Sequence, residues 1–330
     1  MAREDKRADL VFEVGGVKGI GLVGAYSAIE REGYKPVNVA GTSAGSIVGA
    51  LVAAGYTAAE MKTILDQLDY NRFKDKGTID RFPLFGPLIS LLSEKGIYEG
   101  DFVEQWIRDL LWEKRVRYFG DLIRQEYEEE RYKYRLNVIA SDVTNERLVV
   151  LPQGIARYGL QPDRLEVTKA VRMSMSIPIF FEPVIINRAY FVDGGMLSNF
   201  PIWLFDSVEV PEWPTFGIKL IEPDYGRPND IGGPLDFVKA LISTMMEAHD
   251  KMHVENDDIP RTIGVPTGEV RTTEFDISRE KSERLYASGV KAAEDFFAKW
   301  DFARYKAAHR EARSPKWVAK VNKLKQQIVT

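Results

Sequence analysis

Apolar and polar positions along the first residues fall into blocks that predict strands and helices in turn. Residues 10–14 form a short apolar run that ends at a glycine pair, which predicts a strand. Residues 18–32 carry apolar side chains at helical spacing, and residues 37–40 form a second strand-like run before an alanine-rich helix over 44–54. Strand, helix, strand and helix joined by short turns are typical of βαβ units. The pattern therefore predicts an α/β fold with a mainly parallel sheet.

The same reading continues through the rest of the chain. It predicts further strands over 136–142, 148–151, 190–193, 215–220 and 261–265, and further helices over 57–69, 101–111, 166–173, 235–254 and 278–300. No internal repeat or low-complexity segment interrupts this order. We expect one domain over residues 9–302, followed by a basic and helical tail over residues 303–330.

Composition excludes several classes of function. The 330 residues contain no cysteine, so disulfides, thiolate metal sites and cysteine nucleophiles are excluded. The net charge is −4 and no basic field appears, so we expect no nucleic-acid partner. The charged N-terminus has no apolar signal core, and no window is long and apolar enough to span a bilayer. We expect a cytoplasmic protein whose membrane contact, where it occurs, is peripheral.

A Gly-x-Ser-x-Gly motif, Gly41-Thr42-Ser43-Ala44-Gly45, lies where the second predicted strand meets the following helix. This pattern fits a nucleophile elbow, a sharp strand-to-helix turn that presents a serine hydroxyl. Glycine on both sides lets the backbone pass close to itself, because no Cβ is present. The first N–H groups of the helix favour negative charge beside the serine. Ser43 is therefore the predicted nucleophile.

Histidine is one candidate for the base that would activate Ser43. The chain has three histidines, all in predicted C-terminal helical segments: His249, His253 and His309. A Ser-His-Asp hydrolase places its histidine on a loop after a late strand, which none of these does. His249 and His253 are spaced i, i+4 but lack a His-Glu-x-x-His pattern, so we expect no metal site.

Asp193 is the alternative base. It ends a predicted strand, just before Gly194 and Gly195. Ligands of an open α/β sheet sit at the carboxyl ends of its strands, so Asp193 and Ser43 are expected at the same edge. A carboxylate within hydrogen-bond reach of a hydroxyl can orient it and accept its proton. The sequence pattern alone fits equally well an aspartate that only opens a turn.

The turn Gly15-Gly16-Val17-Lys18-Gly19 joins the first strand to the first helix. A glycine pair in this place can direct successive N–H groups at one anion, as in an oxyanion hole. The spacing fits neither the dinucleotide-binding fingerprint nor the P-loop, so no nucleotide cofactor is expected.

These three motifs, in this order, resemble the patatin-like phospholipase family. The resemblance continues through residues 171–183, 197–201 and 261–267 and covers roughly residues 9–300. It implies a three-layer α/β/α fold with a mainly parallel central sheet. It also implies a Ser–Asp dyad with Ser43 as nucleophile and Asp193 as general base, and no metal or other cofactor. The oxyanion hole then involves Gly15, Gly16, Val17, Lys18 and Ala44.

The resemblance implies a serine lipid acyl hydrolase of the phospholipase A or lysophospholipase type, which cleaves glycerolipid esters through an acyl-enzyme. Its partner is a lipid substrate, met at a membrane or micelle surface. Two alternatives stay open: a weakly active or inactive lipid-binding or regulatory protein, and an acyltransferase. One departure bears on them, because Val14 stands where the family often has a first glycine. If that position requires a positive φ, a valine distorts the hole and lowers activity.

Two apolar segments are candidates for the acyl-chain pocket. The first is the run over residues 82–92, broken by two prolines and a glycine, which could wall a channel or form a lid. The second is a cluster that starts at the end of the 166–173 helix, for which packing in the core is the alternative. Its members are Met173, Met175, Ile177, Phe180 and Phe181.

Overall fold

The computed structural model describes residues 6–73, 96–127, 129–222, 259–270 and 277–311, with shorter stretches between residues 231 and 245 and between 318 and 322. The apolar run over 82–92, most of the helix predicted over 235–254 and most of the tail beyond residue 311 lie outside these residues.

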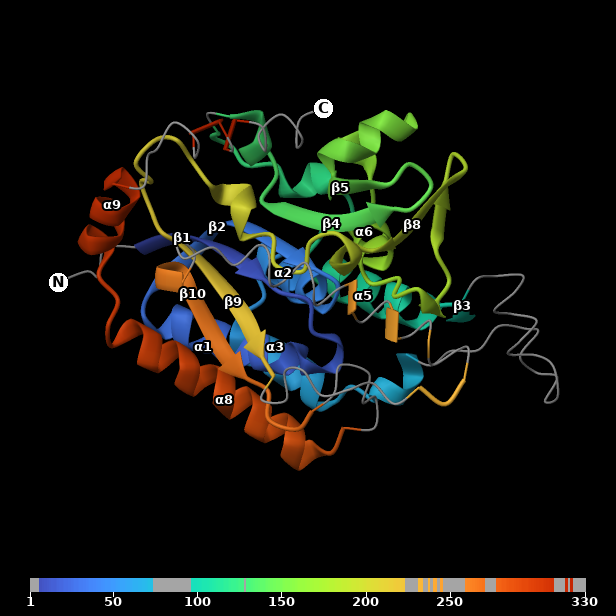
Figure 1. The fold of residues 1–330 in the computed structure, drawn as a ribbon, viewed down its shortest axis with the longest axis horizontal. Helices are drawn as coiled ribbons and strands as arrows, with labels where there is room; N and C mark the ends of the chain where they lie inside the picture. Colours follow the sequence, from blue (N-terminus) through green and yellow to red (C-terminus); the bar gives the residue numbers. More distant parts are fainter. Residues whose placement is uncertain are drawn as a thin grey trace.

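A mixed eight-stranded sheet forms the middle of the molecule (Figure 1). Its order is β10-β9-β1-β2-β4-β8-β7, and β5 pairs with the free side of part of β4. Five strands pair in parallel: β1 (Lys6–Phe12), β2 (Tyr34–Thr42), β4 (Leu136–Asp142), β9 (Thr215–Ile221) and β10 (Thr262–Pro266). Three join through antiparallel pairs: β5 (Arg147–Leu151), β7 (Val184–Ile186) and β8 (Ala189–Asp193). The sheet is therefore mainly parallel, as predicted.

Helical segments cover both faces of this sheet, which gives the three-layer α/β/α architecture (Figure 1). Because side chains alternate along a strand, Leu10 and Phe12 of β1 enter the larger core while Val11 enters a smaller one. The smaller core is closed by a short 3₁₀ helix, Ile202–Phe205. Over the larger core lie α1 (Gly19–Arg31), α2 (Ala44–Ala53), α3 (Ala58–Asp66), α5 (Asp101–Glu113), α6 (Val167–Ser174) and α8 (Arg279–Phe297).

The predicted elements within the described residues are confirmed to within a few positions. The strand over 136–142 has those bounds, and the helix over 57–69 becomes α3, which starts with a capping box between Thr57 and Glu60. Three strands were not predicted: β3 (Gly96–Tyr98), its parallel partner β6 (Ile179–Phe181), and β7. Each has three residues, too few for an alternating pattern to appear. Helix α9 (Phe302–Glu311) lies at the start of the predicted tail, and the domain boundary itself stays a prediction.

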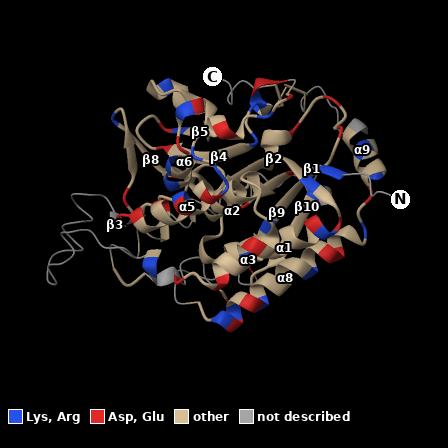
Figure 2. Ribbon diagram, turned by 180° about the vertical axis from the view of Figure 1, so that it is seen from behind, with Lys and Arg blue, Asp and Glu red and all other residues tan. Residues whose placement is uncertain are grey.

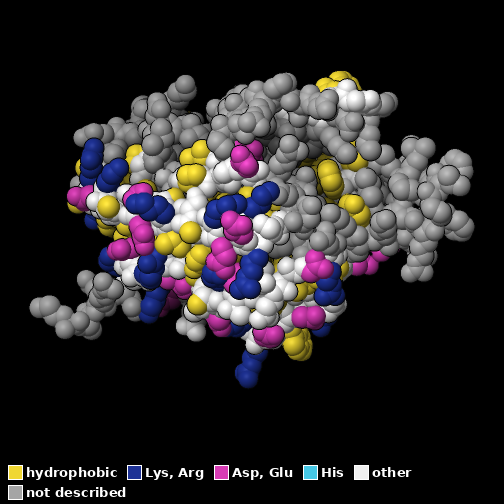
Figure 3. Space-filling view, turned by 90° about the horizontal axis from the view of Figure 1, so that it is seen from below, with side chains coloured by type: hydrophobic (Ala, Val, Ile, Leu, Met, Phe, Trp, Pro, Cys, Tyr) yellow, Lys and Arg dark blue, Asp and Glu magenta, His cyan; other side chains and the backbone are white. Residues whose placement is uncertain are grey.

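The outer surface of α8 carries charges of both signs. In the view from below, Lys and Arg are interspersed with Asp and Glu (Figure 3), and Figure 2 shows the same mixture along α8. Two i, i+4 ion pairs lie on this helix, Arg284 with Glu280 and Lys291 with Asp295. Among the described helices, none combines the length and the apolar character needed to cross a bilayer.

The inner surface of α8 meets α1 through glycines. A Cβ on Gly24 would lie 2.1 Å from the carbonyl oxygen of Tyr286, and one on Gly289 would lie 2.0 Å from that of Gly21. Both neighbours are backbone atoms, which cannot move aside as a flexible side chain can. The two helix backbones can therefore be this close only because these positions lack a side chain.

We predict that Gly289→Ala destabilises the fold by about 1–3 kcal/mol, because the methyl group forces α1 and α8 apart. The higher helix propensity of alanine offsets only part of this loss. Urea unfolding followed by circular dichroism measures the change. The control is Gly233→Ala, since a Cβ there meets nothing within 4 Å. Equal unfolding midpoints for the two variants would contradict the packing argument.

Candidate active site

Ser43 occupies the turn between β2 and α2 in a strained backbone conformation. Its φ is 54° and its ψ is −123°, which a residue with a Cβ rarely adopts. Its N–H donates to Ser174 Oγ at 2.9 Å, and its carbonyl oxygen accepts from Ser46 Oγ at 2.6 Å and from Ser46 N at 2.8 Å. These bonds hold the peptide groups on both sides of Ser43 in place. The geometry is that of a nucleophile elbow.

The motif glycines allow three close backbone approaches around this turn. A Cβ on Gly41 would lie 2.2 Å from the carbonyl oxygen of Gly45, and one on Gly45 would lie 2.3 Å from that of Phe12. On the other side of the site, a Cβ on Gly194 would lie 2.2 Å from the carbonyl oxygen of Ile139. The start of α2 thus presses against the end of β1, and the turn after β8 presses against β4.

The strand that carries Asp193 runs in the opposite direction from the one expected. The expectation placed both residues at the carboxyl edge of parallel strands, but β8 runs antiparallel to β4. Asp193 pairs with Ala140, and Thr42 pairs with the adjacent Ile139. Because β8 is short, its carboxyl end stops at the level of the end of β2. The two residues therefore come together at the same height in the sheet.

The carboxyl group of Asp193 is fully buried. Its Oδ1 accepts a hydrogen bond from Gly195 N at 2.7 Å. Burial raises the pKa of Asp193 to about 7, although hydrogen bonds from the Ser43 side chain and the Gly195 backbone lower it. Among the described residues, Oδ2 has no partner in good hydrogen-bond geometry, so the contact with the Ser43 hydroxyl is loose. Such contacts commonly tighten only when substrate is bound.

The glycine-rich turn after β1 lies against the start of α2. Gly15 N-caps a single 3₁₀ turn, Gly16–Lys18, and Gly16 has a φ of 54°. A Cβ on Gly19 would lie 3.7 Å from the Cβ of Ala44, which brings this turn beside the elbow. The first N–H groups of a helix have no acceptor inside it, so those of Gly16 and Ala44 can bind an anion there.

Val17 and Lys18, which were also predicted at the oxyanion hole, have buried side chains. Val17 lies in the core, and the Lys18 ammonium group forms an ion pair with Glu222 just after β9. Val17 and Lys18 can therefore contribute only backbone groups to an anion site. Beside them, the buried carboxylate of Glu13 accepts from Leu220 N at 2.5 Å and lies 3.2 Å from Lys219 Nζ. This carboxylate ties the turn to β9, a role that the sequence pattern did not predict.

Val14 does not distort the turn through its backbone. It is not among the non-glycine residues with positive φ, and its N–H donates to the carbonyl oxygen of Asn199 at 3.2 Å. The positive φ falls instead on Gly16, where a glycine is present. A valine therefore fits the position before the glycine pair.

Three sets of candidate residues remain: the histidines, metal ligands and the apolar cluster at the end of α6. A ring nitrogen of His309, on α9, is 2.9 Å from the carbonyl oxygen of Glu209, while His249 and His253 lie outside the described residues. In the part of the chain that the structure describes, no cluster of three acidic or histidine side chains is placed to hold a metal ion. The apolar cluster after α6 belongs to the larger core: Met173, Met175 and Phe181 are buried in it, and Ile177 and Phe180 pack against it.

Comparison with known proteins identifies the family. A sequence model described as patatin-like phospholipase matches residues 10–206, which include the turn after β1, the elbow and Asp193. The chain belongs to the patatin-like phospholipase family.

Individual proteins are similar to most of this chain. The uncharacterised protein YqhO of Bacillus subtilis is 40% identical over 304 residues, which cover 89% of this chain and 99% of YqhO. Lysophospholipase NTE1 of Candida albicans is 26% identical over 88% of this chain, which spans only 20% of that longer protein. The fold is also similar to VipD from Legionella pneumophila, with a TM-score of 0.56 and 18% identity over 90% of this chain and 67% of VipD. Membership in this family supports a hydrolase that acts on lipids.

The buried carboxyl group of Asp193 predicts a pH-dependent stability. Its pKa of about 7 in the folded chain is above the ordinary value of 3.8, so the folded chain retains a proton that the unfolded chain has lost. Stability from this group is complete below pH 3.8 and is lost as the pH rises through 7. In Asp193→Asn, a neutral side chain of the same shape replaces the buried charge. Its stability relative to the wild type should therefore increase by about 2–3 kcal/mol between about pH 5 and about pH 8.

Urea unfolding of both proteins at the two pH values measures this difference. The matched control is Asp163→Asn, because that carboxyl group is half exposed and its pKa is lowered by a hydrogen bond from Tyr134. A difference between Asp193→Asn and wild type that stays constant with pH would contradict the assigned pKa.

Proposed function

We propose that this chain is a serine lipid acyl hydrolase in which Ser43 is the nucleophile and Asp193 is the general base. The proposal rests on one observation, that two unusual groups lie close together. One is a serine with a positive φ at the start of a helix, and the other is a buried carboxyl group whose pKa is raised to about 7. Structural roles alone would require neither feature.

The reaction would proceed in two steps. Ser43 Oγ bonds to the ester carbonyl carbon while its proton passes to Asp193. The resulting oxyanion accepts hydrogen bonds from the N–H groups of Gly16 and Ala44. The tetrahedral intermediate breaks its bond to the alcohol, which takes the proton from Asp193 and leaves. A water molecule then gives a proton to Asp193 as its oxygen bonds to the acyl carbon. The bond from that carbon to Ser43 Oγ breaks, Asp193 returns the proton to Oγ, and the fatty acid leaves.

The environment of Asp193 suits this role. A base works best when its pKa is close to the operating pH, and an exposed aspartate is far too weakly basic for a serine hydroxyl. Burial among apolar strands raises the pKa into the useful range, and the hydrogen bond from Gly195 keeps the carboxyl group oriented.

The substrate class is supported by the family and by the names of two relatives. One is the lysophospholipase of Candida albicans, and the other is a probable lipid hydrolase of Invertebrate iridescent virus 6, 27% identical over 58% of this chain and 61% of its own length. Carboxylic esters of glycerolipids are therefore the substrates that we propose.

We expect Ser43→Ala to lower kcat for a p-nitrophenyl acyl ester by at least about 10³-fold, because the nucleophile is lost. The fold should remain intact, and a fluorophosphonate probe should no longer label the protein. Ser288→Ala is the control, since that hydroxyl bonds to the carbonyl oxygen of Pro266, away from the site. Retained hydrolysis would place the nucleophile elsewhere. A wild type that binds lipid but is neither labelled nor active would instead be a lipid-binding protein.

We also expect kcat/KM of the wild type to rise about tenfold for each pH unit below pH 7 and to level off above it, since Asp193 must be deprotonated to accept the serine proton. Asp193→Asn should lose about 10²–10⁴-fold in kcat and lack this rise. Initial rates across the pH range measure both effects. An acid limb near pH 4 would contradict the assignment of Asp193.

A further inference from the structure

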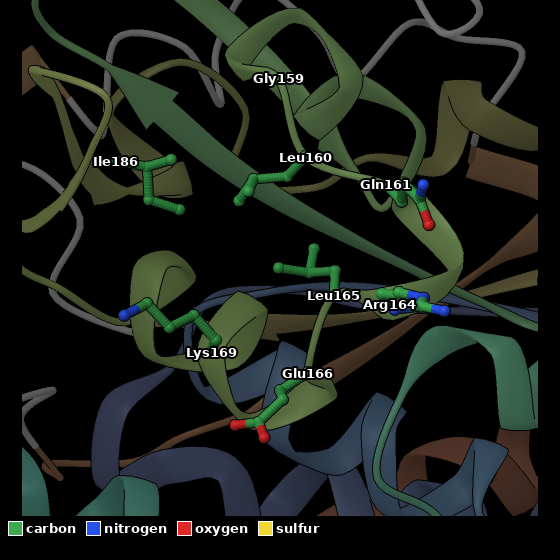
Figure 4. Close-up of a pocket in the computed structure, with 8 residues that line it drawn as sticks. All are labelled: Gly159, Leu160, Gln161, Arg164, Leu165, Glu166, Lys169 and Ile186. Atoms are coloured by element: carbon green, nitrogen blue, oxygen red, sulfur yellow. The ribbon is translucent and has the colours of Figure 1, made fainter.

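Two hollows meet at Gly159, on the side of the sheet formed by β4, β5 and β8. The first has a volume of about 420 Å³, and its apolar side chains Leu160, Leu165 and Ile186 point toward one another (Figure 4). The second has a volume of about 510 Å³ and is polar. Its lining includes three arginines and three neutral side chains that can donate hydrogen bonds: Arg147, Arg157, Arg188, Thr144, Asn145 and Asn187.

Two tight turns bring the arginines together. Arg147 begins β5 after the β4–β5 turn, and Arg188 lies in the β7–β8 turn, where its φ is 70° and that of Asn187 is 47°. Tyr190 N donates to Thr144 Oγ1 at 2.9 Å, which ties the two turns to each other. Arg157 joins them from a third segment, the 3₁₀ helix Gln153–Tyr158.

One buried carboxylate, Asp142, lies opposite Arg147 in the β4–β5 register but has its own hydrogen-bond donors. Asp142 accepts hydrogen bonds from Thr144 N at 2.9 Å, from Asn145 Nδ2 at 2.6 Å and from Tyr158 OH at 2.5 Å. Within the described part of the chain, neither Arg147 nor Arg188 forms an ion pair. The three arginines outnumber the two carboxylates beside them, Asp142 and Glu146, so the rim keeps a net positive charge. Clustered guanidinium groups with neutral donors are the usual recognition chemistry for a phosphate group.

Register places these hollows on the same edge of the sheet as Ser43. β8 starts beyond the carboxyl end of β4 and runs back toward Asp193, which lies four residues, or about 13 Å, from Ala189 at the rim of the polar hollow. The rim is thus separate from the proposed catalytic pair but projects beyond it. Exposed apolar side chains flank it: Val143 is 50% exposed, Leu160 41% and Ile185 53%.

We propose that the paired hollows at Gly159 bind an anionic phospholipid of a membrane surface. The phosphate lies on Arg147, Arg157 and Arg188, and an acyl chain lies against Leu160, Leu165 and Ile186. A soluble phosphate compound would use the arginines but leave the apolar hollow and the exposed side chains around it without a function. The inference rests on the proposed function only in that the site holds the protein on the surface where its ester substrate lies.

The test measures binding of the full chain to phosphatidylcholine vesicles with and without phosphatidylglycerol. All proteins carry Ser43→Ala, so that no lipid is hydrolysed during the measurement. Adding Arg147→Gln and Arg188→Gln should weaken binding to the anionic vesicles by roughly 30-fold, because two charges near the surface are lost. Adding Arg279→Gln and Arg284→Gln should leave it unchanged, because Figures 1 and 2 place α8 on the opposite side of the molecule from β5. Equal binding by both double variants, or equal loss in both, would overturn the proposal.

Two further measurements separate a lipid from a soluble phosphate. Leu160→Gln should weaken vesicle binding without affecting any calorimetric response to inorganic phosphate, since only a lipid uses the apolar hollow. A different outcome would assign the site to a soluble anion and contradict the lipid proposal. In that outcome, inorganic phosphate binds tightly and Arg147→Gln with Arg188→Gln abolishes this binding. Leu160→Gln then changes neither phosphate binding nor vesicle binding.

Kinetics keep this proposal separate from the proposed function. With Ser43 restored, Arg147→Gln with Arg188→Gln should hydrolyse a soluble short-chain ester at the wild-type rate but lose activity on anionic vesicles. Equal activity of the variant and the wild type on these vesicles would overturn the lipid site while leaving Ser43 and Asp193 as proposed. Absence of ester hydrolysis in the wild type would contradict the proposed function, while the vesicle-binding result would still decide the lipid site.

Discussion

The strained backbone at Ser43 is the constraint on which the rest of the site depends. A serine with positive φ costs of the order of 1–3 kcal/mol, so surrounding contacts must maintain it. Helix α2 follows directly, and its later residues Val48, Ala50 and Leu51 anchor it in the larger core. Hydrogen bonds to Ser174 and Ser46 fix the peptide groups on either side. The strain therefore presents the hydroxyl at the helix N-terminus, where negative charge is favoured.

Two opposing effects determine the pKa of the neighbouring carboxyl group. Desolvation raises the pKa of Asp193, and hydrogen bonds from Ser43 and Gly195 oppose it. Desolvation is the larger effect, so the buried carboxyl group has a pKa of about 7, and it forms no ion pair with any residue that the structure describes. The short β8 strand makes this possible, because it delivers Asp193 to the sheet interior at the level of the elbow.

The sequence predicted the parts of this arrangement that short-range chemistry determines. Gly41, Ser43 and Gly45 predicted a nucleophile elbow. The regular helices and the longer strands were predicted from the spacing of apolar residues and from helix caps. What could not be predicted depends on long-range pairing. The direction of β8 depends on its pairing with β4, about 50 residues earlier in the chain. The hydrogen bond from Ser43 to Ser174 and the role of Glu13 join segments more than a hundred residues apart. The three-residue strands β3, β6 and β7 were too short to show a pattern.

The most direct test of the account is a crystal structure of the chain after reaction with a phosphonate ester. The account predicts a bond between phosphorus and Ser43 Oγ, one phosphonyl oxygen on the N–H groups of Gly16 and Ala44, and the Asp193 carboxyl group within hydrogen-bond distance of the adduct. A phosphonate bonded to another residue would contradict it. So would an adduct on Ser43 whose phosphonyl oxygen points away from both N–H groups.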